Sequence, residues 1–279
     1  MSEEIVNLST ADLADLPIKP ADRRIVYGAA PVQFVDFYRP DGAGPWPTLV
    51  LVHGGCWRAQ YGLDHISFLA RTLAERGVAV CSLEYRRLGD EGGGWPGTFL
   101  DVGRGTDLLR ELAANEPLDL DNVVAMGHSA GGHLVQWLGS RHRISSDSPL
   151  YVTDPLPLKG VISLAGVADL AEAIKWGICG ETPAELVGGL PGDIPERYAA
   201  ASPAALLPTG TPQLLITGER DAIVPPAYVA DFAARAVAAG DPVEHIDVQY
   251  AAHFELIVPE SLAWPVVWGA VQKMLGLGA

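Results

Sequence analysis

Ser129 stands at the centre of a Gly-x-Ser-x-Gly sequence that spans residues 127–131. Residues 122–126 before it, apolar from Val123 onward, predict a buried strand, and the residues from 132 onward predict a helix. Glycines two positions before and after the serine let strand and helix approach each other without Cβ clashes. Small residues at a tight turn can also serve packing alone. The strand before and the helix after favour a catalytic nucleophile instead.

A serine hydroxyl is a weak nucleophile until a neighbouring base takes its proton, so a histidine is required. The chain contains seven: His53, His65, His128, His133, His142, His245 and His253. His253 follows the last predicted strand, which places it at the carboxyl edge of the sheet. Of the others, His128 lies in the turn itself, His133 in the helix after it, His65 and His142 on helices, and His245 inside or before the last strand. We therefore predict that His253 is the base.

The base in turn needs an acid that holds its tautomer and stabilises the imidazolium. Asp221 follows a predicted strand at residues 214–218, again at a carboxyl end, and its alternative role is to cap the next helix. Asp169 is the rival acid, with a cap or turn as its own alternative. The chain order Ser129, Asp221, His253 is the order this motif expects, so we prefer Asp221.

Acyl transfer also needs backbone N–H groups that point at the developing oxyanion. One is expected from Ala130, directly after the nucleophile. The others are expected from the loop at residues 53–57 (His-Gly-Gly-Cys-Trp), which follows a buried strand. Adjacent glycines also suit an ordinary tight turn, so their position after this strand carries the prediction. We interpret Cys56 as a backbone contributor.

Four aromatic side chains are candidates for a substrate pocket that accepts an aromatic group. Each of them is equally well explained by packing in the core or in a cap. They are Trp57, Trp95, Trp176 and Phe254.

The elements that must position these residues alternate between strands and helices. Strands are predicted at residues 25–27, 33–38, 47–52, 78–83, 122–126, 161–165, 214–218 and 243–250. Helices are predicted at 64–76, 98–114, 132–141, 226–239 and 262–275. This alternation predicts an α/β fold with a mostly parallel sheet, helices on both faces and a functional edge at the carboxyl ends of the strands. The leading strands can pair antiparallel, and residues 1–22 predict a surface arm or short helix.

Residues 167–208 interrupt this alternation. They contain no clear strand and are rich in Ala, Pro and Gly. A connection of this length in a compact domain is often a lid over an active site. We expect a small helical cap inserted into a single domain of residues 1–279, with a plain surface excursion as the alternative.

Composition narrows the class further. Of the 279 residues, 48% are hydrophobic and 19% charged, which is typical of a globular protein with a substantial core. The net charge of −15 argues against nucleic acid or an anionic membrane as partner. No apolar run approaches the roughly 18 residues that span a bilayer. No Cys or His pair has metal-ligand spacing, so we expect no metal and no cofactor.

Three widely spaced cysteines, Cys56, Cys81 and Cys179, make a disulfide framework unexpected and favour a reducing compartment. The first residues, Met1 to Ile5, lack both a basic start and an apolar stretch, so we expect no signal peptide. Together these features predict a soluble cytoplasmic protein.

With these residues in place, the chain resembles the α/β-hydrolase superfamily from about residue 35 to residue 275. The loop at 53–57 is similar to the His-Gly-Gly-x-Trp motif of kynurenine formamidases (arylformamidases). That branch is related to the hormone-sensitive-lipase-like carboxylesterases, whose own loop is His-Gly-Gly-Gly. Cys56 departs from those esterases, which have a third glycine there. Residues 84–87 (Glu-Tyr-Arg-Arg) resemble an Asp/Glu-Tyr-Arg segment of the wider group.

The resemblance implies a serine hydrolase of a small ester or N-formyl amide that works through an acyl-enzyme. The implied roles are nucleophile for Ser129, acid for Asp221, base for His253, and oxyanion amides for Gly55, Cys56 and Ala130. One alternative is a general carboxylesterase on short-chain esters. Another is a catalytically inactive binding module on a hydrolase scaffold. The expected partner is a small molecule, and a homo-oligomer stays open.

Overall fold

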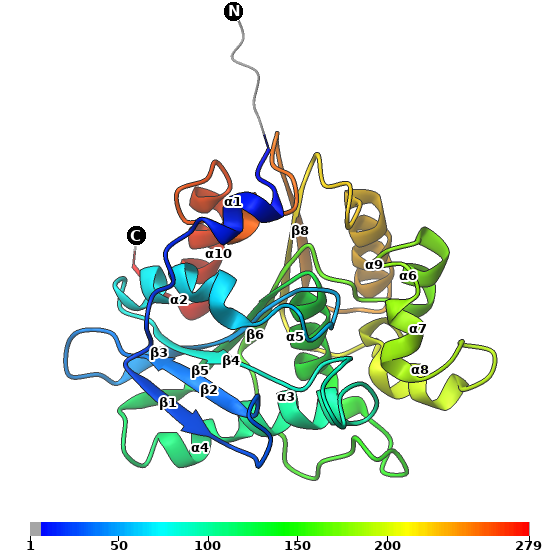
Figure 1. The fold of residues 1–279 in the computed structure, drawn as a ribbon, viewed down its shortest axis with the longest axis horizontal. Coiled ribbons are helices and arrows are strands. Elements are labelled where there is room, and N and C mark those ends of the chain that lie inside the picture. Colours follow the sequence, from blue (N-terminus) through cyan, green and yellow to red (C-terminus); the bar gives the residue numbers. More distant parts are fainter. Residues whose placement is uncertain (1–6, 279) are drawn as a thin grey trace, which may run out of the picture.

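The computed structural model describes residues 7–278 as a central sheet with helices packed on it (Figure 1). The expectation about Met1 to Ile5 therefore lies outside the described residues. Strand order in the eight-stranded sheet is β1-β2-β4-β3-β5-β6-β7-β8. The pairs β1/β2 and β2/β4 are antiparallel and the other neighbours are parallel. This architecture confirms the predicted α/β fold, including its antiparallel leading strands.

All eight predicted strands are present, with ends that differ by a few residues. They are β1 (Arg23–Val26), β2 (Phe34–Tyr38), β3 (Trp46–Val52), β4 (Ala79–Leu83), β5 (Leu118–His128), β6 (Gly160–Leu164), β7 (Gln213–Gly218) and β8 (Val243–Val248). The largest difference is in β5, which runs up to the residue before Ser129.

The predicted helices are also present, although two of them are divided. They are η1 (Leu63–Ile66) with α2 (Ser67–Ala74), α3 (Gly97–Asp107) with α4 (Leu109–Leu112), α5 (Ala130–Ser140), α9 (Pro226–Ala238) and α10 (Trp264–Leu275). In Figure 1, α2 and α10 lie together on one side of the sheet and α3 and α5 on the other. The N-terminal arm contains a short helix, α1 (Thr10–Ala14).

The register of the two central strands sets the position of the functional edge. Val50 of β3 is opposite Ala125 of β5, and Val52 is opposite Gly127. These strands are apolar and buried because helices cover both faces of the sheet. Since parallel neighbours end at the same edge, the loop that begins at residue 53 and the turn at Ser129 emerge side by side.

The segment 167–208 is helical and contains no strand, as predicted. It folds into α6 (Leu170–Trp176), α7 (Thr182–Val187), α8 (Pro195–Ala201) and the short η3 (Pro203–Leu206). It is fastened to α5, because Nε1 of Trp137 donates to the Ala200 carbonyl at 2.9 Å. Whether it caps an active site, and whether the whole chain is one functional domain, remain predictions.

One expectation from the sequence is wrong. Cys56 and Cys179, 123 residues apart, form a disulfide with Cα atoms 5.7 Å apart, while Cys81 is a buried free thiol. Spacing in the sequence could not show this, since the fold brings the segment 167–208 back to the loop at 53–57. The cysteine argument for a reducing compartment falls with it, and a cytoplasmic location stays a prediction without that support.

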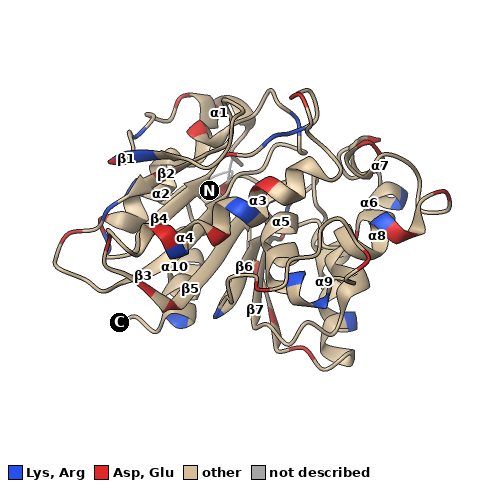
Figure 2. Cartoon of the chain, turned by 90° about the horizontal axis from the view of Figure 1, so that it is seen from below, with Lys and Arg blue, Asp and Glu red and all other residues tan. Residues whose placement is uncertain are grey.

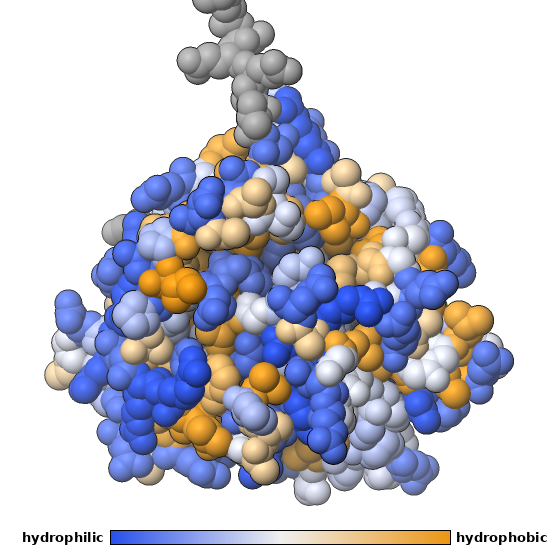
Figure 3. All heavy atoms as spheres, viewed as in Figure 1, coloured by the Kyte–Doolittle hydropathy of each residue, from blue (hydrophilic) through white to orange (hydrophobic). Residues whose placement is uncertain are grey.

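The surface is mixed in charge and polarity. Acidic and basic residues are dispersed along the helices and loops (Figure 2), and apolar residues are scattered among polar ones on the face seen in Figure 3. Within residues 7–278, the helices are too short or too polar for any of them to cross a bilayer.

Candidate active site

Ser129 occupies a strained turn between β5 and α5. Its backbone has φ 55° and ψ −118°, a left-handed conformation that is uncommon for a residue with a side chain. The turn is possible only because its neighbours lack side chains. A Cβ on Gly127 would lie 2.3 Å from the Gly131 carbonyl oxygen, and one on Gly131 would lie 2.1 Å from the Val52 oxygen. These contacts confirm the steric role predicted for the two glycines.

The elbow is also fixed by backbone hydrogen bonds. The Ser129 N–H donates to the Leu164 carbonyl of β6 at 2.8 Å, and the His133 N–H donates to the Ser129 carbonyl at 3.1 Å. Helix α5 therefore begins directly after the serine, so its N-terminal amides face the region beside the hydroxyl. Ala130, the predicted oxyanion donor, is the first residue of this helix.

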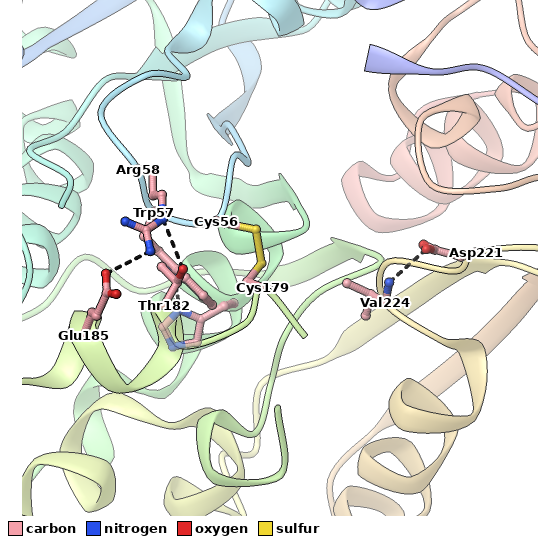
Figure 4. Close-up of a disulfide and its surroundings, with 9 residues drawn as sticks. Cys56, Trp57, Arg58, Cys179, Thr182, Glu185, Asp221 and Val224 are labelled. Atoms are coloured by element: carbon pink, nitrogen blue, oxygen red, sulfur yellow. Dashed lines mark hydrogen bonds and ion pairs between the residues drawn. A yellow bond between two sulfur atoms is a disulfide. The ribbon is translucent and has the colours of Figure 1, made fainter. Parts of the chain in front are cut away.

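Asp221 and His253 form a buried, short-range pair. Nδ1 of His253 is 2.6 Å from Oδ2 of Asp221. The other carboxylate oxygen, Oδ1, accepts the N–H groups of Ile223 at 2.8 Å and Val224 at 2.9 Å. Both side chains are at most 5% exposed. The carboxylate is thus held on one side by the backbone and presents its other oxygen to the imidazole, as Figure 4 shows for the bond to Val224.

Asp169, the rival acid, has a structural role instead. Its carboxylate accepts the N–H groups of Ala171 and Glu172 as the N-cap of α6. It also pairs with Arg235 at 2.9 Å. These contacts match the cap role weighed as its alternative, and the structure pairs His253 with Asp221 instead.

The loop that carries His253 is fastened at two points. Nε2 of His128 donates to the His253 carbonyl at 3.0 Å, and the two rings lie 4.4 Å apart. Glu255, a buried carboxylate, accepts the Ala252 N–H at 3.0 Å. Burial and then the neighbouring His253 lower the pKa of His128 well below its ordinary value. A neutral His128 keeps one ring nitrogen as the donor that this contact needs.

The loop at residues 53–57 has an unusual backbone. Gly55, Cys56 and Trp57 have φ values of 110°, 48° and 54°, so three successive residues are left-handed. A Cβ on Gly54 would lie 2.8 Å from the His128 carbonyl oxygen, so this glycine lets the loop approach the elbow closely. The structure thus brings the predicted oxyanion residues Gly55 and Cys56 to the same edge as Ser129.

A buried polar network supports this loop from below. Nε2 of His53 contacts Oε1 of Glu84 at 2.9 Å, and the Tyr85 hydroxyl donates to the His53 carbonyl at 3.0 Å. Burial raises the pKa of Glu84, but His53 and Arg87 outweigh burial and the net pKa is lowered. The segment at 84–87, which resembles a family motif, therefore holds the start of the loop at residues 53–57 in place.

A cavity of about 320 Å³ opens at this edge. Ser129, His253, Gly55 and Cys56 all contribute to its wall. Its other lining residues are Thr10, Leu13, Ala14, Tyr61, His65, His128, Ile223 and Phe254. Most of these are apolar or aromatic, which is typical of a small-molecule pocket. Two of the three predicted triad residues, Ser129 and His253, and two residues of the predicted loop, Gly55 and Cys56, therefore line a single cavity, while Asp221 contacts His253 outside the lining.

Only one of the four predicted pocket aromatics is at this wall. Phe254 lines the cavity, whereas the described lining does not include Trp57, Trp95 or Trp176. Trp57 is fully buried and its Nε1 donates to His133 at 3.2 Å. Trp95 packs on Phe99, and Trp176 is about half exposed on α6. These three tryptophans therefore pack in the core or lie at the surface, which is the packing alternative weighed for them.

One wall of the cavity was not predicted from the sequence. Helix α1 contributes Thr10, Leu13 and Ala14 to the cavity. It is held there by Glu255, whose Oε1 accepts the Leu8 N–H at 2.7 Å and Asn7 Nδ2 at 2.9 Å. The one local signal is a capping box that marks the helix start, and it says nothing about where the helix docks.

No metal centre accompanies these groups in the described part of the chain, where no three His, Cys, Asp or Glu side chains are grouped so as to hold an ion. The site thus consists of an elbow serine, a histidine with its aspartate, and amide-rich turns. Together with the sheet order, this arrangement defines the α/β-hydrolase class.

Within that class the chain belongs to the BD-FAE family, whose pattern matches residues 35–235. Esterase LipC of Mycobacterium tuberculosis is 28% identical over 84% of this chain and 60% of its own length. Kynurenine formamidase of Danio rerio is 26% identical over 52% of this chain and 46% of its own. The chain thus spans less than two thirds of these relatives.

Solved structures agree on the fold. Esterase B of Lactobacillus rhamnosis, in a structure with a tributyrin phosphonate inhibitor, has a TM-score of 0.78 at 21% identity, covering 96% of this chain and 89% of that one. A truncated carbohydrate esterase from gut microbiota has a TM-score of 0.75 at 18% identity, covering 91% and 99%. At these identities the likeness establishes the architecture.

The buried His133 generates a prediction about pH. Its Nε2 donates to the Ala201 carbonyl and its Nδ1 accepts from Trp57, and burial lowers its pKa to about 4. Between the unfolded pKa of 6.5 and this value the unfolded chain binds more protons, so stability falls as pH falls. We expect this group to remove about 2 kcal/mol of the free energy of unfolding between pH 7 and pH 4.5.

Chemical denaturation of the wild type and of His133→Gln at a series of pH values measures this effect. Glutamine can donate to Ala201 and accept from Trp57 but does not titrate, so the variant should lose less stability on acidification. His142→Gln, at a histidine whose Nε2 likewise donates to a backbone carbonyl, that of Thr209 at 2.9 Å, is the matched control. Parallel curves for wild type and His133→Gln would contradict the assignment.

Proposed function

We propose that this chain is a serine hydrolase that cleaves small carboxylic esters through an acyl-enzyme. The observation that carries this proposal is the Asp221–His253 pair, 2.6 Å apart, in which His253 lines the same cavity as the elbow residue Ser129. The esterase names of two related proteins support the same class. Because the chain spans only part of their lengths, the activity is offered as a proposal.

In the proposed mechanism His253 takes the hydroxyl proton of Ser129 through Nε2 as the oxygen attacks the ester carbonyl. The oxyanion forms between the amides of Gly55, Cys56 and Ala130. Collapse of this intermediate expels the alcohol, which receives the proton from His253. Water then enters, His253 removes its proton, and a second collapse releases the carboxylic acid and restores the serine hydroxyl.

Asp221 has a specific task in this scheme. Its Oδ2 accepts from Nδ1 of His253, which leaves Nε2 free to act as the base and stabilises the imidazolium. The two backbone donors on Oδ1 prevent the carboxylate from rotating away. The charge is therefore fixed before substrate binds, which is the condition for electrostatic preorganisation.

The lining of the cavity favours an uncharged, apolar substrate. Leu13, Ile223, Phe254 and Tyr61 provide apolar surface, and the described lining residues include no Lys or Arg. A volume of about 320 Å³ lies at the small end of ligand pockets. A short acyl chain or a small alcohol fits such a space.

An N-formyl amide is the second candidate substrate. The His-Gly-Gly-Cys-Trp loop at residues 53–57 and the similarity to a kynurenine formamidase over 149 aligned residues support it. A formyl group needs almost no acyl pocket, so in this case the cavity would hold the aromatic amine that leaves. The lack of a cationic lining residue within the described chain favours the ester over a substrate with a free carboxylate.

The third possibility is a binding module that has lost catalysis. The close Asp221–His253 pair and the strained Ser129 argue against it, because such strain is retained where it serves a function. Reaction with a fluorophosphonate probe distinguishes the two. An inactive scaffold would leave Ser129 unlabelled.

Substitutions at the proposed nucleophile and at the two candidate acids, Asp221 and Asp169, test the catalytic assignment. Ser129→Ala should lower kcat/KM for a p-nitrophenyl ester by roughly 10³-fold or more, because the acyl-enzyme cannot form. Asp221→Asn should lower it by a similar order, because His253 loses its oriented tautomer. Asp169→Asn is the matched control and should stay within a few-fold, since asparagine caps a helix as well as aspartate. Equal loss in both aspartate variants would overturn the choice of acid.

The second prediction separates the candidate substrates. Purified protein assayed in parallel on p-nitrophenyl acetate, p-nitrophenyl butyrate and N-formylkynurenine should hydrolyse the esters with the higher kcat/KM. The physical reason is the apolar, cation-poor cavity. A kcat/KM for N-formylkynurenine above that for both esters would reverse the order of the two proposals.

The third prediction concerns the wall formed by α1. Leu13→Phe narrows the cavity and should lower kcat/KM for longer p-nitrophenyl acyl esters by about 10-fold relative to the acetate, while Leu13→Ala should favour longer chains. Ile18→Ala, at an exposed residue of the same arm outside this cavity, is the control. An equal effect of the Leu13 variants on every chain length would show that α1 does not contact the substrate.

A further inference from the structure

We propose that the Cys56–Cys179 disulfide is a positioning element for the oxyanion loop, so that turnover depends on whether this crosslink is intact. The inference rests on the proposed serine hydrolase function. It goes beyond that function because it makes catalysis sensitive to thiol reductants. It also gives the helical segment 167–208 a part in the chemistry although, in the described chain, the segment contributes no residue to the cavity wall.

The loop is a conformation that needs external support. Cys56 and Trp57 have side chains but adopt φ values of 48° and 54°. Such backbone states cost on the order of 1–3 kcal/mol each and persist only where surrounding structure over-determines them. Without a tether, a non-glycine residue relaxes toward negative φ. That relaxation would rotate the peptide planes whose N–H groups are proposed to hold the oxyanion.

The flank of the loop after Cys56 is fastened by several contacts. Nε1 of Trp57 donates to His133 at 3.2 Å, and the Trp57 carbonyl accepts the Leu88 N–H at 2.8 Å. Arg58 reaches across to α7, with Thr182 at 3.2 Å and Glu185 at 2.9 Å. Figure 4 shows Arg58 with its two partners on α7 beside the disulfide. Cys56 itself, one of the proposed oxyanion donors, is tethered through its sulfur to Cys179.

The other end of the crosslink is anchored. Cys179 lies in a turn between α6 and α7, where its carbonyl accepts the Thr182 N–H at 3.2 Å, and the preceding Ile178 is 2% exposed. The segment is bound in turn to α5, since His133 and Trp137 donate to the carbonyls of Ala201 and Ala200 at 2.9 Å each. A continuous series of contacts therefore connects Ser129, through α5 and the segment 167–208, to Cys56.

Reduction opens this path at one bond. A dithiol such as dithiothreitol transfers two electrons and two protons. Its thiolate attacks one sulfur, the mixed disulfide is displaced by its second thiol, and the products are two cysteine thiols and a cyclic disulfide. The ester-binding cavity keeps its walls, but Cys56 loses its tether. Because oxyanion donors act in the transition state and not on the bound ester, kcat should fall while KM changes little.

The experiment compares oxidised wild type, dithiothreitol-reduced wild type, and the Cys179→Ser variant on a p-nitrophenyl ester. We expect kcat at least about 10-fold lower in the reduced and variant proteins, with KM within about 2-fold. Reoxidation of the reduced wild type should restore kcat. Cys81→Ala, which removes the buried free thiol, is the matched control and should behave as the wild type in both redox states.

A fluorophosphonate probe gives the second readout. Its labelling rate should fall in parallel with kcat, whereas the final extent of labelling should stay complete, which shows that Ser129 and the fold are retained. A merely stabilising crosslink would lower the melting temperature but leave kcat per labelled site unchanged, and this result would overturn the proposal. So would free Cys56 and Cys179 thiols in the active oxidised protein. Absence of both turnover and labelling in the oxidised wild type would overturn the hydrolase function itself, independently of the thiol count.

Discussion

The left-handed backbone of Ser129 is the constraint on which the rest of the structure depends. A chain that turns from β5 into α5 within one residue brings the helix against β3, so closely that a Cβ on Gly131 would lie 2.1 Å from the Val52 oxygen. The parallel register of β3 and β5 then places the loop at 53–57 next to the serine. Strain at one residue thus determines which loop can supply amides to it.

Burial makes the polar groups around this elbow interdependent. An unpaired buried polar group costs more than a pair contributes, so each must find a partner inside the protein. Asp221 divides its oxygens between the backbone and His253, and His128 contacts the carbonyl of the same histidine. Glu255 accepts the Ala252 N–H and so holds the loop that carries His253. Displacing any one of these groups would leave the others unsatisfied, and this keeps the imidazole in place.

Local patterns in the sequence were sufficient to predict the scaffold. Apolar runs and alternating patterns between turns predicted every strand. The rule that function lies at carboxyl strand ends selected His253, and the chain order of the motif selected Asp221 over Asp169. They could not identify contacts between distant segments. The Cys56–Cys179 bond joins residues 123 apart, and Leu13 reaches the cavity only because Glu255 binds the chain near residue 8. Such pairings depend on tertiary structure. So does the choice between core and pocket for a bulky residue near a motif, such as Trp57, which the sequence left open and the structure places in the core.

The two segments outside the regular α/β alternation, α1 and residues 167–208, are held at the site by different interactions. Helix α1 has five residues, too few to be stable alone, so it forms where Glu255 and the packing of Leu13 hold it. The wall that it provides therefore depends on the loop that carries His253. The segment 167–208 instead packs on α5 and is covalently bound to Cys56. The shape of the cavity thus depends on α1, a helix too short to be stable alone. The proposed oxyanion geometry depends instead on the segment 167–208, which is bound covalently. Selection can change the first without disturbing the second.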